Sequence, residues 1–305
     1  MDVDRHAERT FLGSDWERIG RGPELGESKG KRDRDQARDR PGTRDARPQG
    51  RSNWHDSVTS SPSDGARMPN ERERRPLAFL VDAHGTLFHE HPQRHLIYAA
   101  AFGRHGLRAT PDEIARIMGA VHASLPRRID GHFRYTEGWF RVYAAEVAGH
   151  LRFDGELEPL THELLTAFRV KSSFRAYPEA RAVIKRLRGA RIPIAVVSNW
   201  GPHLPSVLGQ LGFHGDFDAI VASALAQVEK PDPSIFRKAA RALGVAIEDC
   251  LHVGDHIEND YEGARSVGAA ALWLRREPDA DGESSATTSI DSLRGVLARF
   301  GLPDL

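Results

Sequence analysis

The chain has 305 residues, 39% of them hydrophobic and 28% charged, and its 43 Lys and Arg balance 43 Asp and Glu. A net charge of zero gives no overall field that would favour nucleic acid or an anionic membrane as the partner. The single cysteine, Cys250, cannot form an intrachain disulfide, and no apolar run approaches the roughly 20 residues that span a bilayer.

The N-terminal quarter differs in composition from the rest of the chain. Residues 29–51 are dense in Arg, Asp, Gly and Pro and show no apolar periodicity. Such a segment buries too little apolar surface to offset its ordering entropy, so we predict a disordered tail over residues 1–75. Its arginines could contact nucleic acid weakly, but the aspartates between them argue against this. Because the N-terminus has no apolar stretch typical of a signal peptide, we expect a cytoplasmic protein without membrane contact.

A short apolar run, Leu77–Val81, is typical of a buried parallel strand and delivers Asp82 to its C-terminal end. Gly85 and Thr86 follow in a tight turn, whose backbone N–H groups and hydroxyl suit an anion. Ligands of open α/β sheets bind at this edge, where an aspartate can attack phosphorus or ligate a hard cation. The alternative interpretation is an aspartate that only ends a strand and caps a turn.

About ninety residues after this strand show helical spacing and no convincing strand. One helix is expected to begin at Pro111, with Thr110 as its N-cap and Glu113 at the capping-box position. We predict a helical bundle, inserted over residues 89–175 between the first and second strands. Inserts of this kind close over a site, which makes several polar and aromatic side chains candidate substrate contacts: Arg127, Arg128, His132, Tyr135 and Trp139.

Strands and helices then alternate to the end of the chain. The predicted strands cover residues 192–198, 219–222, 251–254 and 269–274, and the predicted helices cover 178–188, 204–211, 233–243, 261–267 and 290–300. A polar loop is expected at 278–289. This alternation predicts an α/β fold, a three-layer Rossmann-like parallel sheet with right-handed crossovers, built from residues 76–88 and 176–305.

Polar residues follow the later strands as Asp82 follows the first. Ser198 and Asn199 end one strand, Lys230 precedes a proline-opened helix, and Asp255 ends another strand with Asp260 five residues later. Each alone has a simpler explanation, as an N-cap, a solvated charge or a turn residue. Their shared location at strand ends favours a common site.

These motifs resemble those of a known family. Asp82-x-His84-Gly85-Thr86-Leu87, Ser198-Asn199, Lys230-Pro231 and Gly254-Asp255-x4-Asp260 are similar to the four motifs of the haloacid dehalogenase (HAD) superfamily. Neighbouring residues, such as Tyr177-Pro178 and Asn259-Asp260, resemble its subfamily with a helical cap after the first strand. The resemblance covers about residues 76–302 and leaves out the N-terminal quarter.

The resemblance implies a Mg²⁺-dependent phosphohydrolase that acts on a small phosphorylated metabolite through an aspartyl phosphate. Asp82 would be the nucleophile, and Lys230 would neutralise the transferring group. Thr86, Ser198 and Asn199 would bind the phosphate or orient the nucleophile. The Mg²⁺ ligands would be oxygens from four residues: Asp82, the backbone carbonyl of His84, Asp255 and, through water, Asp260.

His84 is where the sequence departs from the family pattern, because typical family phosphatases carry a second aspartate there as the general acid and base. Histidine exchanges protons near neutral pH and could serve both steps. If it cannot, two alternatives remain open. One is a catalytically weakened protein of the same fold that binds or regulates. The other is a 2-haloacid dehalogenase, although Asp255 and Asp260 are retained and the aromatic residue expected two positions after the nucleophile is missing.

Overall fold

The computed structural model describes residues 75–276 and 288–305. Both ranges belong to one unit of the chain, Gly65–Leu305. The predicted tail, apart from Arg75, and most of the predicted loop at 278–289 lie outside the described residues, so both stay predictions. Within the described residues, no helix combines the length and the apolar character needed to cross a membrane.

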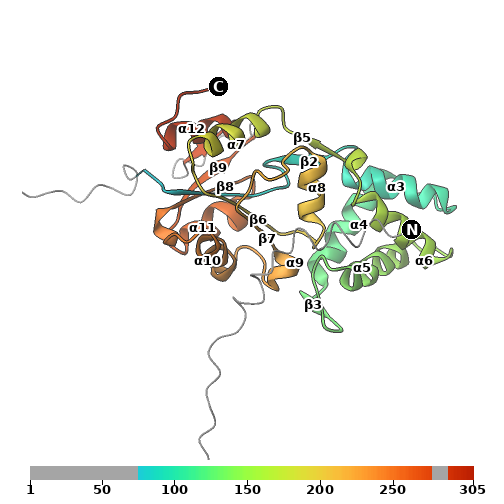
Figure 1. The fold of residues 1–305 in the computed structure, drawn as a ribbon. Helices are drawn as coiled ribbons and strands as arrows, with labels where there is room; N and C mark the ends of the chain where they lie inside the picture. Colours follow the sequence, from blue (N-terminus) through green and yellow to red (C-terminus); the bar gives the residue numbers. More distant parts are fainter. Residues whose placement is uncertain (1–74, 277–287) are drawn as a thin grey trace, which may run out of the picture. The chain divides into compact units, whose positions relative to one another are not determined.

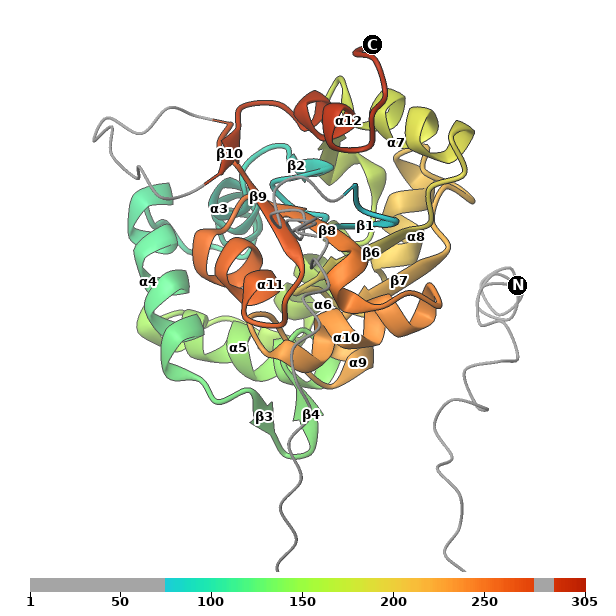
Figure 2. The same ribbon diagram turned by 90° about the vertical axis from the view of Figure 1, so that its left-hand side faces the viewer.

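A parallel sheet of six strands forms the centre of the described structure. Its strands, in spatial order, are β10 (Ser289–Ile290), β9 (Ala270–Leu274), β8 (Cys250–Gly254), β1 (Ala78–Val81), β6 (Ile194–Ser198) and β7 (Ala219–Ala222) (Figure 2). The chain passes from β1 to β6 and β7 on one side and then returns to β8 on the other side of β1. Ligand sites form where the strand order reverses in this way, outside the carboxyl ends of the strands. The end of β1 is therefore the expected place for a site.

Helices cover both faces of this sheet. They are α7 (Ala180–Gly189), α8 (Leu204–Gln210) and α12 (Val296–Arg299) on one face, with α10 (Pro233–Ala242) and α11 (Gly263–Arg265) on the other. Successive residues of a strand point to opposite faces, so Phe79 and Val81 join the first core while Ala78 and Leu80 join the second. Figure 1 shows α7 and α12 on one side of the sheet and α10 and α11 on the other. The predicted three-layer α/β fold with a parallel sheet is confirmed.

Four α-helices lie between residues 91 and 173 in the chain, and we call the segment that contains them, Arg94–Ala167, the helical insert. They are α3 (Arg94–Arg104), α4 (Pro111–Ser124), α5 (Glu137–His150) and α6 (Leu157–Ala167). The predicted N-cap is present, because the Thr110 hydroxyl accepts a hydrogen bond from the backbone N–H of Glu113 at 3.2 Å. The inserted helices are as predicted, whereas the domain boundaries at residues 89 and 175 stay a prediction.

The prediction that this region lacks strands was wrong. β2 (Phe88–Glu90) pairs antiparallel with β5 (Phe174–Ala176), so that the chain leaves and re-enters the core side by side. β3 (Arg128–Ile129) and β4 (His132–Phe133) form a hairpin between α4 and α5 (Figure 2). Strands of two or three residues are too short for a hydrophobic alternation to be recognised. Their pairing is decided by the partner strand.

Two predicted helices near the C-terminus have different bounds. The helix expected at 290–300 is reduced to a 3₁₀ turn, Leu293–Gly295, and α12. Ile290 instead lies in β10, and its carbonyl accepts a hydrogen bond from the backbone N–H of Arg275 at 2.8 Å. The helix expected at 261–267 begins earlier, with a π-helical turn at Ile257–Glu262 that continues into α11. Such wide turns are frequent at functional sites.

Candidate active site

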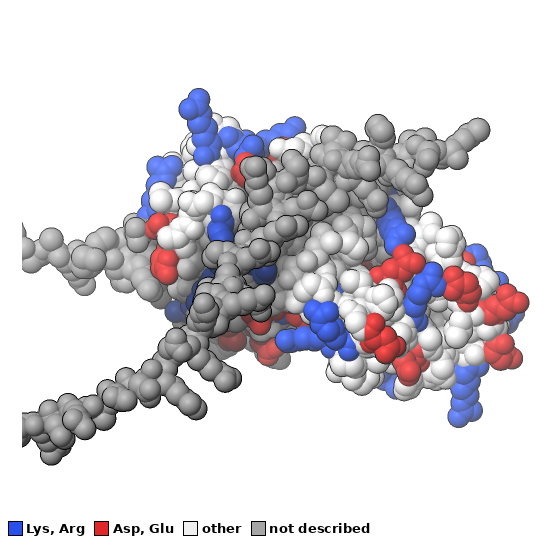
Figure 3. Space-filling model, turned by 60° about the horizontal axis from the view of Figure 1, so that its bottom comes forward, with Lys and Arg blue, Asp and Glu red and all other residues white. Residues whose placement is uncertain are grey.

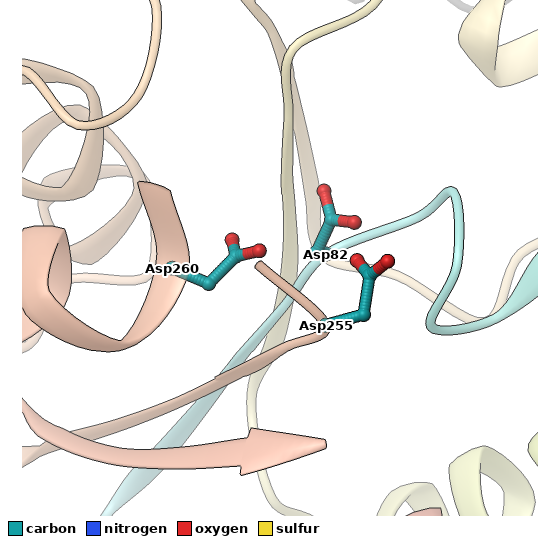
Figure 4. A group of neighbouring side chains, drawn as sticks. All are labelled: Asp82, Asp255 and Asp260. Carbon is teal, nitrogen blue, oxygen red and sulfur yellow. The ribbon is translucent and has the colours of Figure 1, made fainter. Parts of the chain in front are cut away.

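Three aspartates meet at the carboxyl edge of the sheet, beside the end of β1. Asp82 directly follows β1, Asp255 directly follows β8, and Asp260 lies in the π-helical turn. Each offers a carboxylate oxygen within 4.8 Å of the others, and the side chains converge in Figure 4. The parallel sheet is the cause, because its neighbouring strands end at the same edge. The structure thus brings together the three acids that the sequence placed at strand ends.

Lys230 joins two of these acids. Its Nζ donates hydrogen bonds to Oδ1 of Asp82 and to Oδ1 of Asp260, both at 2.5 Å, and its side chain is buried. Burial disfavours the ammonium charge, but the two carboxylates outweigh it and raise the pKa of Lys230. The lysine is therefore a cation held against Asp82, and its predicted role toward a transferring group stays a prediction.

If all three were ionised, the carboxylates would carry more negative charge than Lys230 can balance. Partial desolvation, with repulsion from Asp82 and Asp260, raises the pKa of the exposed Asp255 carboxyl to about 7. Burial alone would raise the pKa of Asp260 as well, but the charge of Lys230 and a hydrogen bond with His252 hold it well below its usual range. A divalent cation would offset the remaining charge, and carboxylate oxygens are the ligands that Mg²⁺ prefers. The donor set therefore fits Mg²⁺.

Two glycines make room for these carboxylates. Gly85 has a φ of +80°, and a Cβ at this position would lie 2.0 Å from Oδ2 of Asp255. A Cβ at Gly254 would lie 2.1 Å from Cγ of Asp260. Both distances are far below van der Waals contact, so a side chain at either position would displace a carboxylate.

The candidate phosphate-binding residues have different environments. Ser198 is the last residue of β6 and is buried. Thr86 is fully buried, and its hydroxyl has no hydrogen-bond partner among the described residues. Asn199 exchanges two hydrogen bonds with the backbone of Lys230, at 3.0 and 2.7 Å. Its amide therefore holds the lysine segment in place, while contact of Ser198, Thr86 or Asn199 with phosphate stays a prediction.

The side chain of His84 is anchored by a carboxylate that the sequence did not indicate. Its Nε2 contacts Glu90, and Arg94 donates from Nε to the same carboxylate at 2.9 Å. Burial would raise the pKa of Glu90, but the hydrogen bond with His84 and the charge of Arg94 outweigh it and lower this pKa. The His84 ring also lies 5.6 Å from the ring of Trp200. Glu90 and Trp200 together fix where the imidazole lies.

Comparison with known proteins places the chain in a family. The profile of the haloacid dehalogenase-like hydrolases matches residues 77–268. Cattle haloacid dehalogenase-like hydrolase domain-containing protein 3 is 34% identical over 178 residues, which cover 56% of this chain and 70% of that protein. The chain belongs to the haloacid dehalogenase-like hydrolases. The predicted superfamily is thus confirmed, and the protein is a HAD-type hydrolase.

Other HAD relatives carry names of more specific activities. Phosphoserine phosphatase of Thermus thermophilus is 35% identical over 133 residues, or 43% of this chain and about half (53%) of that enzyme. Among solved structures, a HAD phosphatase of Thermococcus onnurineus has a TM-score of 0.54 at 22% identity, over 75% of this chain and 99% of that one. L-2-haloacid dehalogenase of Xanthobacter autotrophicus has a TM-score of 0.58 at 20% identity, over 75% and 100%. These structures share the HAD fold and do not decide between the two chemistries.

The HAD site contains residues that sequence reasoning missed. His252 lies inside β8, is fully buried, and contacts Oδ1 of Asp260 through Nε2 at 2.9 Å. Glu229 precedes Lys230 and pairs with Arg127 at 2.7 Å and Arg134 at 3.5 Å, which flank the β3–β4 hairpin of the helical insert. A histidine within an otherwise apolar strand was the signal for the first contact. The contact of Glu229 with the two arginines had no local signal, because Glu229 lies about a hundred residues after them in the chain.

Proposed function

We propose that this HAD hydrolase is a phosphohydrolase, which transfers a phosphoryl group from a small phosphorylated metabolite to Asp82 and then to water. One observation carries the proposal: the carboxylate that ends the first strand is held by a buried lysine and faces two further carboxylates. Oδ1 of Asp82 is bonded to Lys230, so we assign the attack to Oδ2. The Lys230 charge stabilises the negative charge of the transferring group.

In the first step, a bond forms between Asp82 and phosphorus while the bond from phosphorus to the ester oxygen breaks. The leaving oxygen takes a proton from His84, and the alcohol departs. In the second step, a water molecule gives a proton to His84 and attacks phosphorus, and the bond to Asp82 breaks. Inorganic phosphate leaves, and Asp82 and His84 return to their starting states.

Mg²⁺ would be held by Asp82, Asp255, the backbone carbonyl of His84 and, through water, Asp260, and when bound it supplies charge neutralisation for the phosphoryl group. This assignment agrees with the donor chemistry of the site. It also gives the exposed Asp255 carboxylate a role as a metal ligand.

Two observations favour a small phosphate ester over the alternatives. The retained pair Asp255 and Asp260 adds negative charge beside the nucleophile, which would serve no purpose in a metal-free attack on the carbon of a haloacid. On the face of the molecule in Figure 3, acidic and basic side chains are interspersed over the helical insert, without a patch of one sign. This part of the described surface therefore offers nucleic acid no continuous basic track.

The proposal is tested by release of 4-nitrophenol from 4-nitrophenyl phosphate, with Mg²⁺ or with EDTA. We expect metal-dependent release by the wild type, loss of release in Asp82→Asn, and no change in the exposed control Asp291→Asn. Mass spectrometry of the protein after rapid acid quenching should find one phosphate on Asp82.

Each rival predicts a different result. Equal rates for the wild type and Asp82→Asn would contradict the nucleophile. Chloride release from 2-chloropropionate without Mg²⁺, and no phosphate release, would favour dehalogenation. Absence of both activities would favour a protein that binds or regulates.

A further inference from the structure

A cavity of about 400 Å³ lies between the helical insert and the core, next to the proposed active site. His84 and Asn199 line it. His84 follows Asp82 by two positions in the chain, and Asn199 is hydrogen-bonded to the backbone of Lys230. Its volume lies within the usual range of small-molecule sites. Whatever is attached to a phosphate at Asp82 can therefore extend into this cavity.

Aromatic side chains form much of the lining: Tyr98, Tyr135, Trp139, Phe140, Tyr143 and Trp200. The rings of Trp139 and Tyr143 are stacked, with centroids 5.4 Å apart and planes at 12°. The polar atoms of three of these side chains are bonded within the protein. The indole N–H of Trp139 donates to the carbonyl of Pro126 at 2.9 Å, the Tyr143 hydroxyl donates to the carbonyl of Met118 at 3.3 Å, and the indole N–H of Trp200 donates to Nε2 of His203 at 3.2 Å. These three side chains therefore present ring faces and edges, rather than free polar atoms, to the cavity.

The charged groups around the cavity are paired with one another. Arg94 is bound to Glu90, and Arg169 pairs with Glu137 at 3.0 Å. Burial, reinforced by the nearby charges of Arg134 and Arg94, lowers the pKa of His122 to about 4. Burial and the charge of Arg169 lower the pKa of His203 to about 4. Both imidazoles are neutral at pH 7, so an ionised group on the ligand would find no unpaired partner among these side chains.

The backbone is strained at one residue that lines this cavity. Tyr135 has a φ of +69°, in the left-handed region that is unfavourable for a bulky side chain. Its hydroxyl lies 3.2 Å from Nε2 of His122, and its ring centroid lies 5.8 Å from that of His122. Strain of this kind persists where the surrounding structure requires one side-chain position, and it concentrates in ligand sites.

We propose that this cavity binds an uncharged aromatic ring, and that the substrate is the phosphate monoester of an aromatic or planar heterocyclic alcohol. The inference rests on the proposed phosphohydrolase activity and specifies its substrate class. Ring faces favour aromatic ligands over saturated ones of the same size, and the paired charges disfavour the ammonium and carboxylate groups of phosphoserine.

The test compares three esters of primary alcohols: benzyl phosphate, cyclohexylmethyl phosphate and phosphoserine. We expect kcat/KM for benzyl phosphate to exceed that for cyclohexylmethyl phosphate by about three- to tenfold, the usual worth of one aromatic contact. Phosphoserine should be the poorest of the three. An equal or reversed order of the first two esters would overturn the assignment.

Phe140→Leu removes one half-buried ring of the cavity wall, and Phe153→Leu is the matched control, because Phe153 belongs to the same insert and does not line the cavity. Phe140→Leu should raise KM for benzyl phosphate about threefold or more, leave kcat unchanged, and affect the cyclohexylmethyl ester less. Equal effects on both esters, or no effect on either, would contradict the proposal.

Binding without turnover separates this inference from the proposed function. Benzylphosphonate and cyclohexylmethylphosphonate are titrated into the Asp82→Asn protein with Mg²⁺, by calorimetry. Tighter binding of benzylphosphonate to this variant, together with a wild type that hydrolyses no phosphate ester, would keep the ring site and remove the phosphohydrolase. Hydrolysis of all three esters without preference for the ring would keep the phosphohydrolase and remove the ring site.

Discussion

Nε2 of His84 contacts one carboxylate oxygen of Glu90, while Arg94 binds the other oxygen of the same carboxylate. Glu90 lies in β2, which is paired with β5 at the point where the chain leaves the core. The position of the imidazole is therefore set by the strand pair that connects the helical insert. With Nε2 engaged by Glu90, Nδ1 is the nitrogen that the proposed mechanism would use for proton exchange with a substrate.

Glu90→Gln should weaken catalysis only where the leaving group needs a proton. We expect turnover of an alkyl phosphate to fall about tenfold or more, because the imidazole loses its charged partner. Hydrolysis of 4-nitrophenyl phosphate should fall less, since 4-nitrophenolate leaves without protonation. Steady-state kinetics of the two esters provide the comparison. Glu163→Gln is the matched control, because Glu163 also binds an arginine and a histidine, Arg104 and His105, but on the outer side of the insert.

His84→Asp completes this test. Restoring the aspartate of the family pattern should change the turnover of an aryl phosphate by about tenfold or more, in either direction. A rise would show that His84 is an imperfect substitute, and a fall would show that it is the adapted acid and base. In the His84→Asp background, Glu90→Gln should no longer discriminate between the two leaving groups. Unchanged turnover in His84→Asp would exclude the side chain from the mechanism.

Gly85→Ala should abolish metal-dependent activity beyond its effect on stability. The added Cβ would lie 2.0 Å from the Asp255 carboxylate and would push it out of the site. Gly106→Ala is the control, because Gly106 also has a positive φ, +89°, but a Cβ there meets nothing within 4 Å. Both variants should lose about 1–2 kcal/mol of unfolding free energy from backbone strain. Only Gly85→Ala should also lose the rise in melting temperature on adding Mg²⁺, and retention of that rise would argue against Asp255 as a ligand.

Acid should destabilise the protein partly through His203. Burial and the charge of Arg169 lower its pKa from 6.5 to about 4, and Trp200 donates to its Nε2. Between these two pH values the unfolded chain binds a proton that the folded protein does not, so stability is complete above pH 6.5 and falls as the pH drops toward 4. Because the ring is partly exposed, we expect the unfolding free energy to fall by about 1 kcal/mol, and the melting temperature by a few degrees, between pH 7 and 5.

Calorimetry of His203→Gln checks this pH dependence. The glutamine carbonyl can still accept the Trp200 hydrogen bond, while the titrating group is removed. The variant should lose less melting temperature than the wild type between pH 7 and 5. The exposed His162→Gln should follow the wild type, and the same loss in all three proteins would refute the role of His203.

The order of the functional residues could be predicted from the sequence because the signal is local. Leu77–Val81 is apolar at every position and ends at Asp82, and the strand that ends at Asp255 is apolar apart from His252. Parallel strands place their carboxyl ends at one edge, so residues 173 positions apart in the chain had to meet. Short strands give no such signal: the pattern predicts a helix at Ile290, whereas the residue pairs with β9.

The sequence by itself determined the parallel α/β sheet and the aspartates that follow its strands, because a buried strand and its polar end can be recognised within ten residues. Only the tertiary structure decided that Glu90 holds His84, that Asn199 holds the Lys230 segment, and that aromatic rings of the insert enclose a cavity beside them. These contacts join segments that no periodic pattern in the sequence relates to each other. They arise from the packing of the helical insert against the core, which no local pattern specifies.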